Sequence, residues 1–164
     1  CLFFSIFFLR AQLAVSNNLR LTGAVFLNVD GDFDATGGII DFDSDDPEIH
    51  ISGAPTSFGT LDNAHGVIVL DGSSSQNLSE AETFWKLRVN NSSGVSLGAN
   101  TTINGVLTLG NGNLTTAGNT LLLKSSTASG SDAGHIVGQT SLETATNSDE
   151  YQIDVGNGTT WRNR

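Results

Sequence analysis

Apolar and polar residues alternate with a period of two along most of the chain. In residues 84–89, Leu87 and Val89 fall on one side of an extended segment, and Lys86 and Arg88 fall on the other. The same alternation marks Val67/Val69, Val95/Leu97, Ile103/Gly105/Leu107/Leu109 and Leu121/Leu123. Helix signals are nearly absent, because the best helix candidate, residues 77–87, contains the strand-favouring run Thr83-Phe84-Trp85. The pattern predicts an all-β chain whose strands, about 4 to 6 residues long, are separated by glycine and asparagine turns.

The arrangement of strands and turns also repeats. Residues 23–42 read GAVFLNVDGDFDATGGIIDF, residues 105–123 read GVLTLGNGNLTTAGNTLLL, and a single deletion aligns the two segments. Glycines then match at Gly23/Gly105 and Gly37/Gly118, and apolar residues match at Leu27/Leu109, Phe33/Leu114, Ile40/Leu121 and Phe42/Leu123. No reactive side chain recurs with them, so the repeat describes a structural scaffold.

Two all-β architectures fit this pattern, a right-handed parallel β-helix (a β-solenoid) and an antiparallel β-sandwich. Three observations favour the solenoid. The strands recur at short intervals, and no proline-rich linker bounds the repeated unit of about 80 residues. Asparagine and threonine also gather near turns, at residues 90–93 and 100–102, where stacked coils would form polar ladders.

The amino-acid composition makes several classes of function improbable for this chain. Only 15% of the residues are charged, against about 25% in an average soluble domain. The formal net charge of −10 repels nucleic acids and anionic lipid, so a nucleic-acid partner is not expected. Cys1 is the only cysteine, which excludes an internal disulfide and a cysteine-based zinc site. Acylation of Cys1, as in a lipoprotein, is a minor alternative.

The ends of the chain differ from its middle. The apolar run Leu2–Leu9 is too short to span a bilayer, which takes about 20 residues, so an integral membrane protein is not expected. Because Ala11 follows at a suitable cleavage position, residues 1–11 are predicted to be a signal-peptide remnant, with a buried terminal strand as the alternative. Residues 12–164 are then the β-solenoid repeat region. Strand-like residues 151–162 run nearly to the terminus, so we expect a region truncated at its C-terminus.

Several segments resemble a recurrent module of large repetitive surface proteins of Gram-negative bacteria that carry type IX secretion sorting domains. The resemblance lies in residues 84–97 (FWKLRVNNSSGVSL) and 102–123 (TINGVLTLGNGNLTTAGNTLLL), and it continues in residues 134–138 and 153–162. It covers residues 65–162, with a weaker copy over 18–53. The module usually continues Arg-Pro-Val, and Asn163 stands here in place of that proline.

The resemblance implies a β-helical, adhesin-like stalk segment of a secreted or surface-anchored bacterial protein, located outside the cell or on its surface. Such a segment is not an enzyme. Its expected partners are an extracellular polysaccharide or a surface receptor, together with further repeats of the same chain. Two alternatives remain, a carbohydrate-binding or polysaccharide-degrading β-helix and a calcium-stabilised adhesin domain.

The sharpest local feature is an acidic run in which eight of the 17 acids fall within residues 30–48. Phe33, Ile40 and Phe42 are expected to face the core, so the neighbouring aspartates would lie on the solvent side of two strands joined by a glycine turn. A calcium ion would relieve the repulsion between these carboxylates, although an EF-hand does not fit because Ala35 stands where its glycine belongs. The alternative is a solvated acidic face that prevents edge-to-edge association. The candidate calcium ligands are Asp30, Asp32, Asp34, Asp41, Asp43 and Asp45.

Other chemistry finds little support in the sequence. We predict no catalytic residue and no cofactor other than calcium. Paired carboxylates suggest polysaccharide cleavage, but the nearest basic residues, Arg20 and Lys86, lie well outside the acidic run. The three histidines are widely spaced and are interpreted as turn or strand-edge residues: His50, His65 and His135. Aromatic residues that would stack on sugars are Phe84, Trp85, Tyr151 and Trp161, and one of the adjacent pair Phe84 and Trp85 must face solvent.

Overall fold

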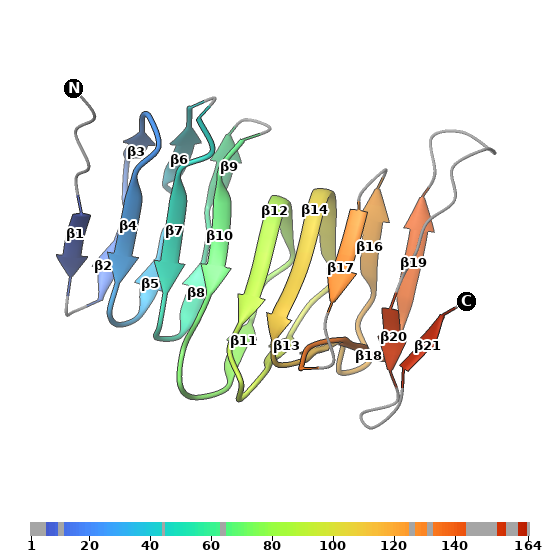
Figure 1. Ribbon diagram of the computed structural model, residues 1–164. Helices are drawn as coiled ribbons and strands as arrows, with labels where there is room; N and C mark the ends of the chain where they lie inside the picture. The colour runs from blue at the N-terminus through green and yellow to red at the C-terminus, as the bar shows by residue number, and fades with distance from the viewer. Residues whose placement is uncertain are drawn as a thin grey trace.

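The computed structural model shows parallel β-strands stacked as a β-solenoid of about six turns (Figure 1). It describes residues 6–9, 12–43, 45–62, 65–124, 127–130, 133–143, 154–156 and 161–163. Within these residues there is no helix, and every strand pair but one is parallel. The prediction of an all-β parallel solenoid is confirmed, and the antiparallel sandwich is wrong. No helix in this part of the chain is long and apolar enough to cross a membrane.

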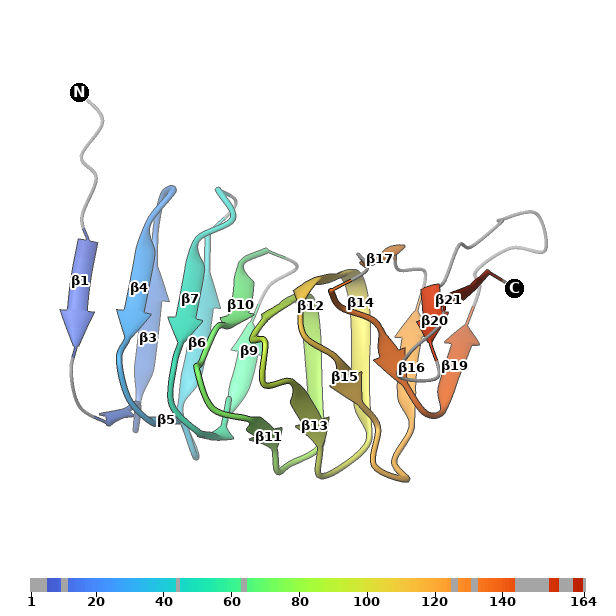
Figure 2. The ribbon, with the colours of Figure 1, turned by 60° about the horizontal axis from the view of Figure 1, so that its bottom comes forward.

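Each turn of the solenoid contributes a strand to each of three faces. Face 1 contains β1 (Ile6–Leu9), β4 (Phe26–Val29), β7 (Glu48–Ile51), β10 (Val67–Leu70), the second halves of β12 (Glu82–Asn90) and β14 (Thr101–Asn111), and β17 (Thr127–Gly130). Face 2, brought forward in Figure 2, contains β2 (Leu13–Ala14), β5 (Phe33–Asp34), β8 (Pro55–Ser57), β11 (Gln76–Leu78), β13 (Val95–Leu97), β15 (Leu114–Thr115), β18 (Ile136–Val137) and β20 (Asp154–Gly156). Face 3 contains β3 (Asn18–Leu21), β6 (Ile39–Phe42), β9 (Thr60–Asp62), the first halves of β12 and β14, β16 (Leu121–Lys124) and β19 (Thr140–Glu143). The remaining strand, β21 (Trp161–Asn163), pairs antiparallel with β20.

One turn is the structural repeat. Paired residues on neighbouring turns lie 19 to 23 positions apart in the sequence, so apolar residues of successive turns stack directly on one another. On face 1 one inward column is Leu27, Ile49, Ile68, Leu87 and Leu107. All but Leu27 are at most 2% exposed. Because each buried aliphatic side chain contributes about 1.5–3 kcal/mol, such columns hold the turns together.

The internal repeat seen in the sequence corresponds to segments four turns apart. Phe33 and Leu114 occupy face 2, while Ile40 and Leu121 occupy face 3, and all four are fully buried. The aligned glycines Gly37 and Gly118 both have positive φ, 74° and 89°. The alignment is wrong by two residues on face 1, because the column of Leu27 reaches Leu107 rather than Leu109. The corners between strands differ in length between the two segments. An alignment with a single deletion therefore cannot match the residues of all three faces at once.

The predicted alternation holds on most strands. Phe33, Ile40 and Phe42 face the core, and of the adjacent aromatic pair Phe84 is fully buried whereas Trp85 is 37% exposed. On β10 the aligned register places Val67 beside Lys86 and Val69 beside Arg88, so these valines lie on the outer side of face 1 and Ile68 and Leu70 point inward. Two strands exceed the expected length, since β12 has 9 residues and β14 has 11.

Candidate functional site

A cluster of charged side chains lies on the outer side of face 1. We call it the outer-face cluster, and it consists of Asp46, Glu48, His50, Asp71, Lys86 and Arg88. The strand register explains why these residues meet. The column Glu48, Val67 and Lys86 and the column His50, Val69 and Arg88 run side by side across three neighbouring strands. Because both valines are short, charged side chains from the turns on either side reach across them.

His50 lies at the centre of the cluster between two carboxylates. Its Nδ1 is 2.7 Å from Asp71 Oδ2, and its Nε2 is 2.9 Å from Glu48 Oε2. The hydrogen bond to Asp71 raises the pKa of His50, burial opposes this shift, and the bond to Glu48 raises the pKa further. The Phe26 ring covers His50 with a centroid separation of 5.9 Å. The imidazolium form is therefore the one this environment favours.

Two cations join turns that are not neighbours. Arg88 donates from Nη1 to Glu48 Oε2 at 3.0 Å, and Lys86 donates to Asp46 Oδ2. Each pair is separated by 40 positions, or two turns. The bond from Lys86 lowers the pKa of Asp46, whose backbone has a positive φ of 51° at the corner between β6 and β7. His65 also approaches Asp46, with Nδ1 3.8 Å from Oδ1.

A shallow depression of about 300 Å³ lies within this part of face 1. Its polar rim is formed by Asp46, Glu48, Lys86, Arg88 and Thr108, and its apolar lining by Val67, Leu87 and Val106. Apolar side chains next to hydrogen-bonding groups are a feature that this depression shares with small-molecule sites. Trp85, which precedes Lys86 in β12, packs over the Gly105 backbone next to Val106.

Three of the predicted calcium ligands lie at the corner between β4 and β5 or on β5 itself. Asp30 accepts a hydrogen bond from Ser52 Oγ at 3.2 Å, and Asp32 accepts one from the Ala54 amide at 2.8 Å. Asp34 Oδ1 accepts bonds from the Thr36 hydroxyl at 2.6 Å and the Thr36 amide at 2.9 Å, and these bonds lower the pKa of Asp34. These carboxylates thus stabilise turns and neighbouring coils.

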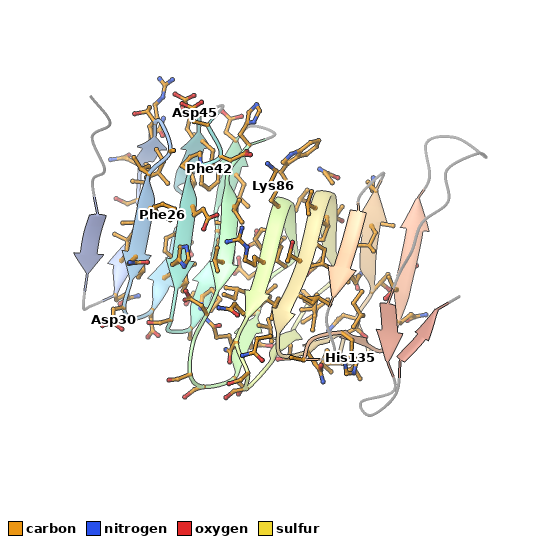
Figure 3. All side chains as sticks on the ribbon, viewed as in Figure 1. Phe26, Asp30, Phe42, Asp45, Lys86 and His135 are labelled. Carbon is orange, nitrogen blue, oxygen red and sulfur yellow. The ribbon has the colours of Figure 1, made fainter. Side chains whose placement is uncertain are left out.

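The other three lie on β6 or beyond it, at the opposite end of the strands. Figure 3 shows Asp30 and Asp45 at opposite ends of the first turns. Asp41 is on β6, with Oδ2 3.4 Å from Arg20 Nε, and Asp43 and Asp45 follow β6. The six aspartates are therefore divided between two regions, one at the β4–β5 corner and on β5, the other on β6 and directly after it. Within the described residues no group of three or more His, Cys, Asp or Glu side chains has an arrangement that could hold a metal ion. Calcium binding stays a prediction, and a melt with and without millimolar Ca²⁺ would test it.

The other predicted site residues are dispersed. His50 is on β7, a central strand of its sheet, and not in a turn or at a strand edge. His65 precedes β10, and His135 is buried beside β18 (Figure 3). The side chains of Tyr151 and Trp161 lie outside the described residues.

Sequence reasoning missed the outer-face cluster. Its members come from three separate segments, residues 46–50, Asp71 and residues 86–88, which lie one or two turns apart, and a spacing of 19 residues links Glu48 to Val67 and Val67 to Lys86. The charged pairs themselves lie 21 positions apart (His50 and Asp71) or 40 positions apart (Lys86 and Asp46, Arg88 and Glu48), so a search for opposite charges at one and two turn lengths would have found them. Arg20 and Lys86, which are remote from the acidic run in sequence, both contact it in space through Asp41 and Asp46.

Comparison with known proteins identified no relative: no family model, no curated protein and no solved structure matches this chain.

Proposed function

We propose that this chain is a non-enzymatic stalk segment of a secreted or surface-anchored bacterial repeat protein, with an adhesive outer surface. The observation that carries the proposal is the stacking of apolar columns through consecutive turns beneath an outer surface of paired charges and Ser, Thr and Asn side chains. A solenoid of this kind is quasi-one-dimensional, and its length is set by the number of turns. The adhesin-like identity and the type IX sorting route come from the sequence resemblance and belong to the proposal.

The distribution of carboxyl groups supports a non-enzymatic role. Polysaccharide hydrolysis requires two carboxyl groups on opposite sides of a substrate, one of them with a raised pKa. Burial raises the pKa of Glu82, but this side chain faces the interior, where Oε1 accepts the Phe58 amide at 3.0 Å. In the depression, Asp46 and Glu48 each bond a cation.

An adhesion assay tests the proposal, with the 164-residue chain attached to beads through a tether. We expect them to adhere to extracellular polysaccharide or to bacterial surfaces, and we expect the chain to release no new reducing ends from polysaccharides. Adhesion equal to that of beads coated with an unrelated acidic protein would contradict an adhesive role. Release of reducing ends that is abolished by Glu48→Gln would show an enzyme instead.

Carbohydrate binding at the depression is a second candidate. It is favoured by the combination of an apolar floor, hydrogen-bonding groups of both charges on the rim, and the exposed Trp85 beside Lys86. A saccharide array would identify ligands, and Trp85→Ala and Arg88→Ala are expected to weaken binding about tenfold each. Lys124→Ala on face 3 is the matched control, because it removes a cation outside the depression. Equal binding by all three variants would place the sugar elsewhere.

A further inference from the structure

The backbone ladder of the solenoid is incomplete between its third turn (β7, β8 and β9) and its fourth turn (β10, β11 and the first half of β12). On face 1, β7 and β10 pair over four residues, from Glu48 beside Val67 to Ile51 beside Leu70. On faces 2 and 3 the strands of the two turns belong to different sheets, because β8 ends one three-stranded sheet and β9 ends another. Neighbouring turns on both sides of this junction pair on all three faces.

On face 2, the side chain of Gln76 replaces the missing backbone pairing. Its Nε2 donates to the Ile51 carbonyl at 2.9 Å and to the Gly53 carbonyl at 2.6 Å. Its Oε1 accepts the Gly72 amide at 3.2 Å and Asn91 Nδ2 at 2.9 Å. Gln76 is only 3% exposed, so these bonds are formed in the interior. A glutamine can do this because its amide carries both donors and an acceptor.

On face 3, Glu82 has the corresponding role. It is 9% exposed, and its Oε1 accepts the Phe58 amide of the third turn at 3.0 Å. On face 2, near the surface, the Ser79 hydroxyl also donates to the Thr56 carbonyl of β8 at 3.0 Å. On these two faces a few side-chain hydrogen bonds thus replace the backbone hydrogen bonds that join the other turns. Each of these side-chain hydrogen bonds contributes about as much as one backbone hydrogen bond. Faces 2 and 3 are therefore joined less strongly between the third and fourth turns than between the neighbouring pairs of turns.

Face 1 is reinforced at the same place. The bonds of Lys86 to Asp46 and of Arg88 to Glu48 run from the fifth turn to the third, across the outer surface of β10. His50 joins the third turn to Asp71, which follows β10. One face of the junction therefore has a backbone ladder and charged cross-links, and the other two faces have neither.

We propose that the junction between the third and fourth turns is a hinge, which opens along faces 2 and 3 while face 1 holds the two parts of the solenoid together. Opening breaks the two bonds of Gln76 Nε2 and the bond of Glu82 together and parts the edge-to-face contact of Phe58 with Phe84, whose ring centroids are 5.1 Å apart. The hinge is a local opening of the kind that native proteins undergo below their global unfolding free energy. In a stalk it would allow bending at one defined turn without loss of the chain's continuity.

Hydrogen–deuterium exchange of the 164-residue chain tests the proposal through two amides on different faces. The Phe58 amide bonds Glu82 across the junction. The Gly72 amide bonds Gln76 within the fourth turn and is buried against the Ser52 backbone of the third, so opening would expose it to solvent. If the faces open together, Gln76→Leu should speed exchange at Phe58 about tenfold, although the acceptor of that amide is intact. In the reciprocal variant, Glu82→Ala, exchange at Gly72 should accelerate by a similar factor.

The matched control is Asn119→Ala. Asn119 also joins two turns through a side chain, with Nδ2 donating to the Leu97 carbonyl at 2.7 Å, but β13 and β15 keep their backbone pairing there. This variant should leave exchange at Phe58 unchanged. If Gln76→Leu fails to fold, Ser79→Ala removes an exposed bond of the same junction and should still accelerate Phe58 and Gly72 by about twofold. Acceleration confined to the amide next to each substitution would overturn the hinge.

Discussion

The first turns of the solenoid and the later turns differ in the corner that connects face 3 to face 1. In the first turns this corner contains residues 22–25 between β3 and β4, and residues 43–47 between β6 and β7. In the later turns it shrinks to Trp85 within β12 and to residues 104–105 within β14, where the register shifts by one residue. Short corners fuse two strands into one, which explains the unusual lengths of β12 and β14.

The short corner depends on a close approach between turns. A Cβ added at Gly105 would lie 2.7 Å from the Trp85 carbonyl oxygen and 3.0 Å from its indole ring, so only glycine fits under this tryptophan. At the long corner of residues 22–25, a Cβ added at Gly23 would meet nothing within 4 Å. The long corner of residues 43–47 carries three acids, Asp43, Asp45 and Asp46. The same stacked core thus supports an acidic, looped edge in one region and a compact edge in the other. Corner length, and not the core, determines the surface of each region.

The largest expected effect comes from breaking the contact that joins the two regions. Phe58 is 1% exposed and packs against Phe33 on one side and Phe84 on the other. Phe58→Ala should lower the free energy of unfolding by about 3–5 kcal/mol, because it leaves a cavity between the regions. Thermal melts and chemical denaturation measure this loss, and we expect the transition to split into two. A cost equal to that of Leu107→Ala, with a single transition, would show that the junction behaves like the rest of the core.

A one-residue insertion separates the role of the corner from that of the strand. A glycine inserted between Leu107 and Thr108 turns Leu109 from the core toward solvent and should cost at least about 3 kcal/mol. The same glycine inserted between Asn104 and Gly105 only lengthens the corner and should cost about 1 kcal/mol or less. Denaturation midpoints compare the two variants directly. Equal costs would contradict the view that corner length varies freely in this fold.

Glu82 provides a smaller effect at the junction. Burial raises the pKa of Glu82, and the neighbouring charge of Glu80 contributes to the rise. The folded state therefore favours the protonated carboxyl, and stability falls as pH rises through the range between the unfolded and folded pKa values. Glu82→Gln keeps an oxygen for the Phe58 amide and should stabilise the chain at neutral pH by up to about 1 kcal/mol, after allowance for solvent screening.

Melting at two pH values tests this expectation. The gain from Glu82→Gln should shrink near about pH 4, where the wild-type carboxyl is itself protonated. Asp62→Asn is the matched control, because it removes an acidic charge from an exposed position that does not contribute to the pKa shift of Glu82. A larger gain in stability from the control than from Glu82→Gln would mean that the gain comes from lowering the net negative charge of the chain, and not from the burial of Glu82.

The smallest effect concerns His50 in the outer-face cluster. Its raised pKa means that its contribution to stability is complete below the unfolded value of about 6.5 and is lost as pH rises through the folded value. The loss should stay below about 1 kcal/mol, because the side chain is partly exposed and solvent screens the charges. His50→Gln should flatten the dependence of the melting temperature on pH above neutrality. An unchanged pH profile would show that the two carboxylates do not stabilise the imidazolium.

Much of the fold followed from the alternation of apolar and polar residues. The inward positions of Phe33, Ile40 and Phe42 and the burial of Phe84 beside an exposed Trp85 were predictable, because a strand with one buried face shows its orientation in a few residues. The side of β10 was predicted wrongly, because the alternation assigned Val67 and Val69 to the same side as the inward residues of the other strands. All four of its residues are apolar and buried, and only the register with Lys86 and Arg88 shows that Val67 and Val69 face outward.

By itself, the sequence determined an all-β chain, its parallel solenoid architecture, and the residues of most of its core. Tertiary structure decided which charges meet. Arg20 reaches Asp41 one turn away, and Lys86 reaches Asp46 two turns away, although both cations are distant from the acidic run in sequence. Alternation is a local property of each strand, whereas contacts between turns depend on the length of every corner that lies between them. Because that length varies from turn to turn, the outer-face cluster and the incomplete ladder at the junction became visible only once the turns were stacked.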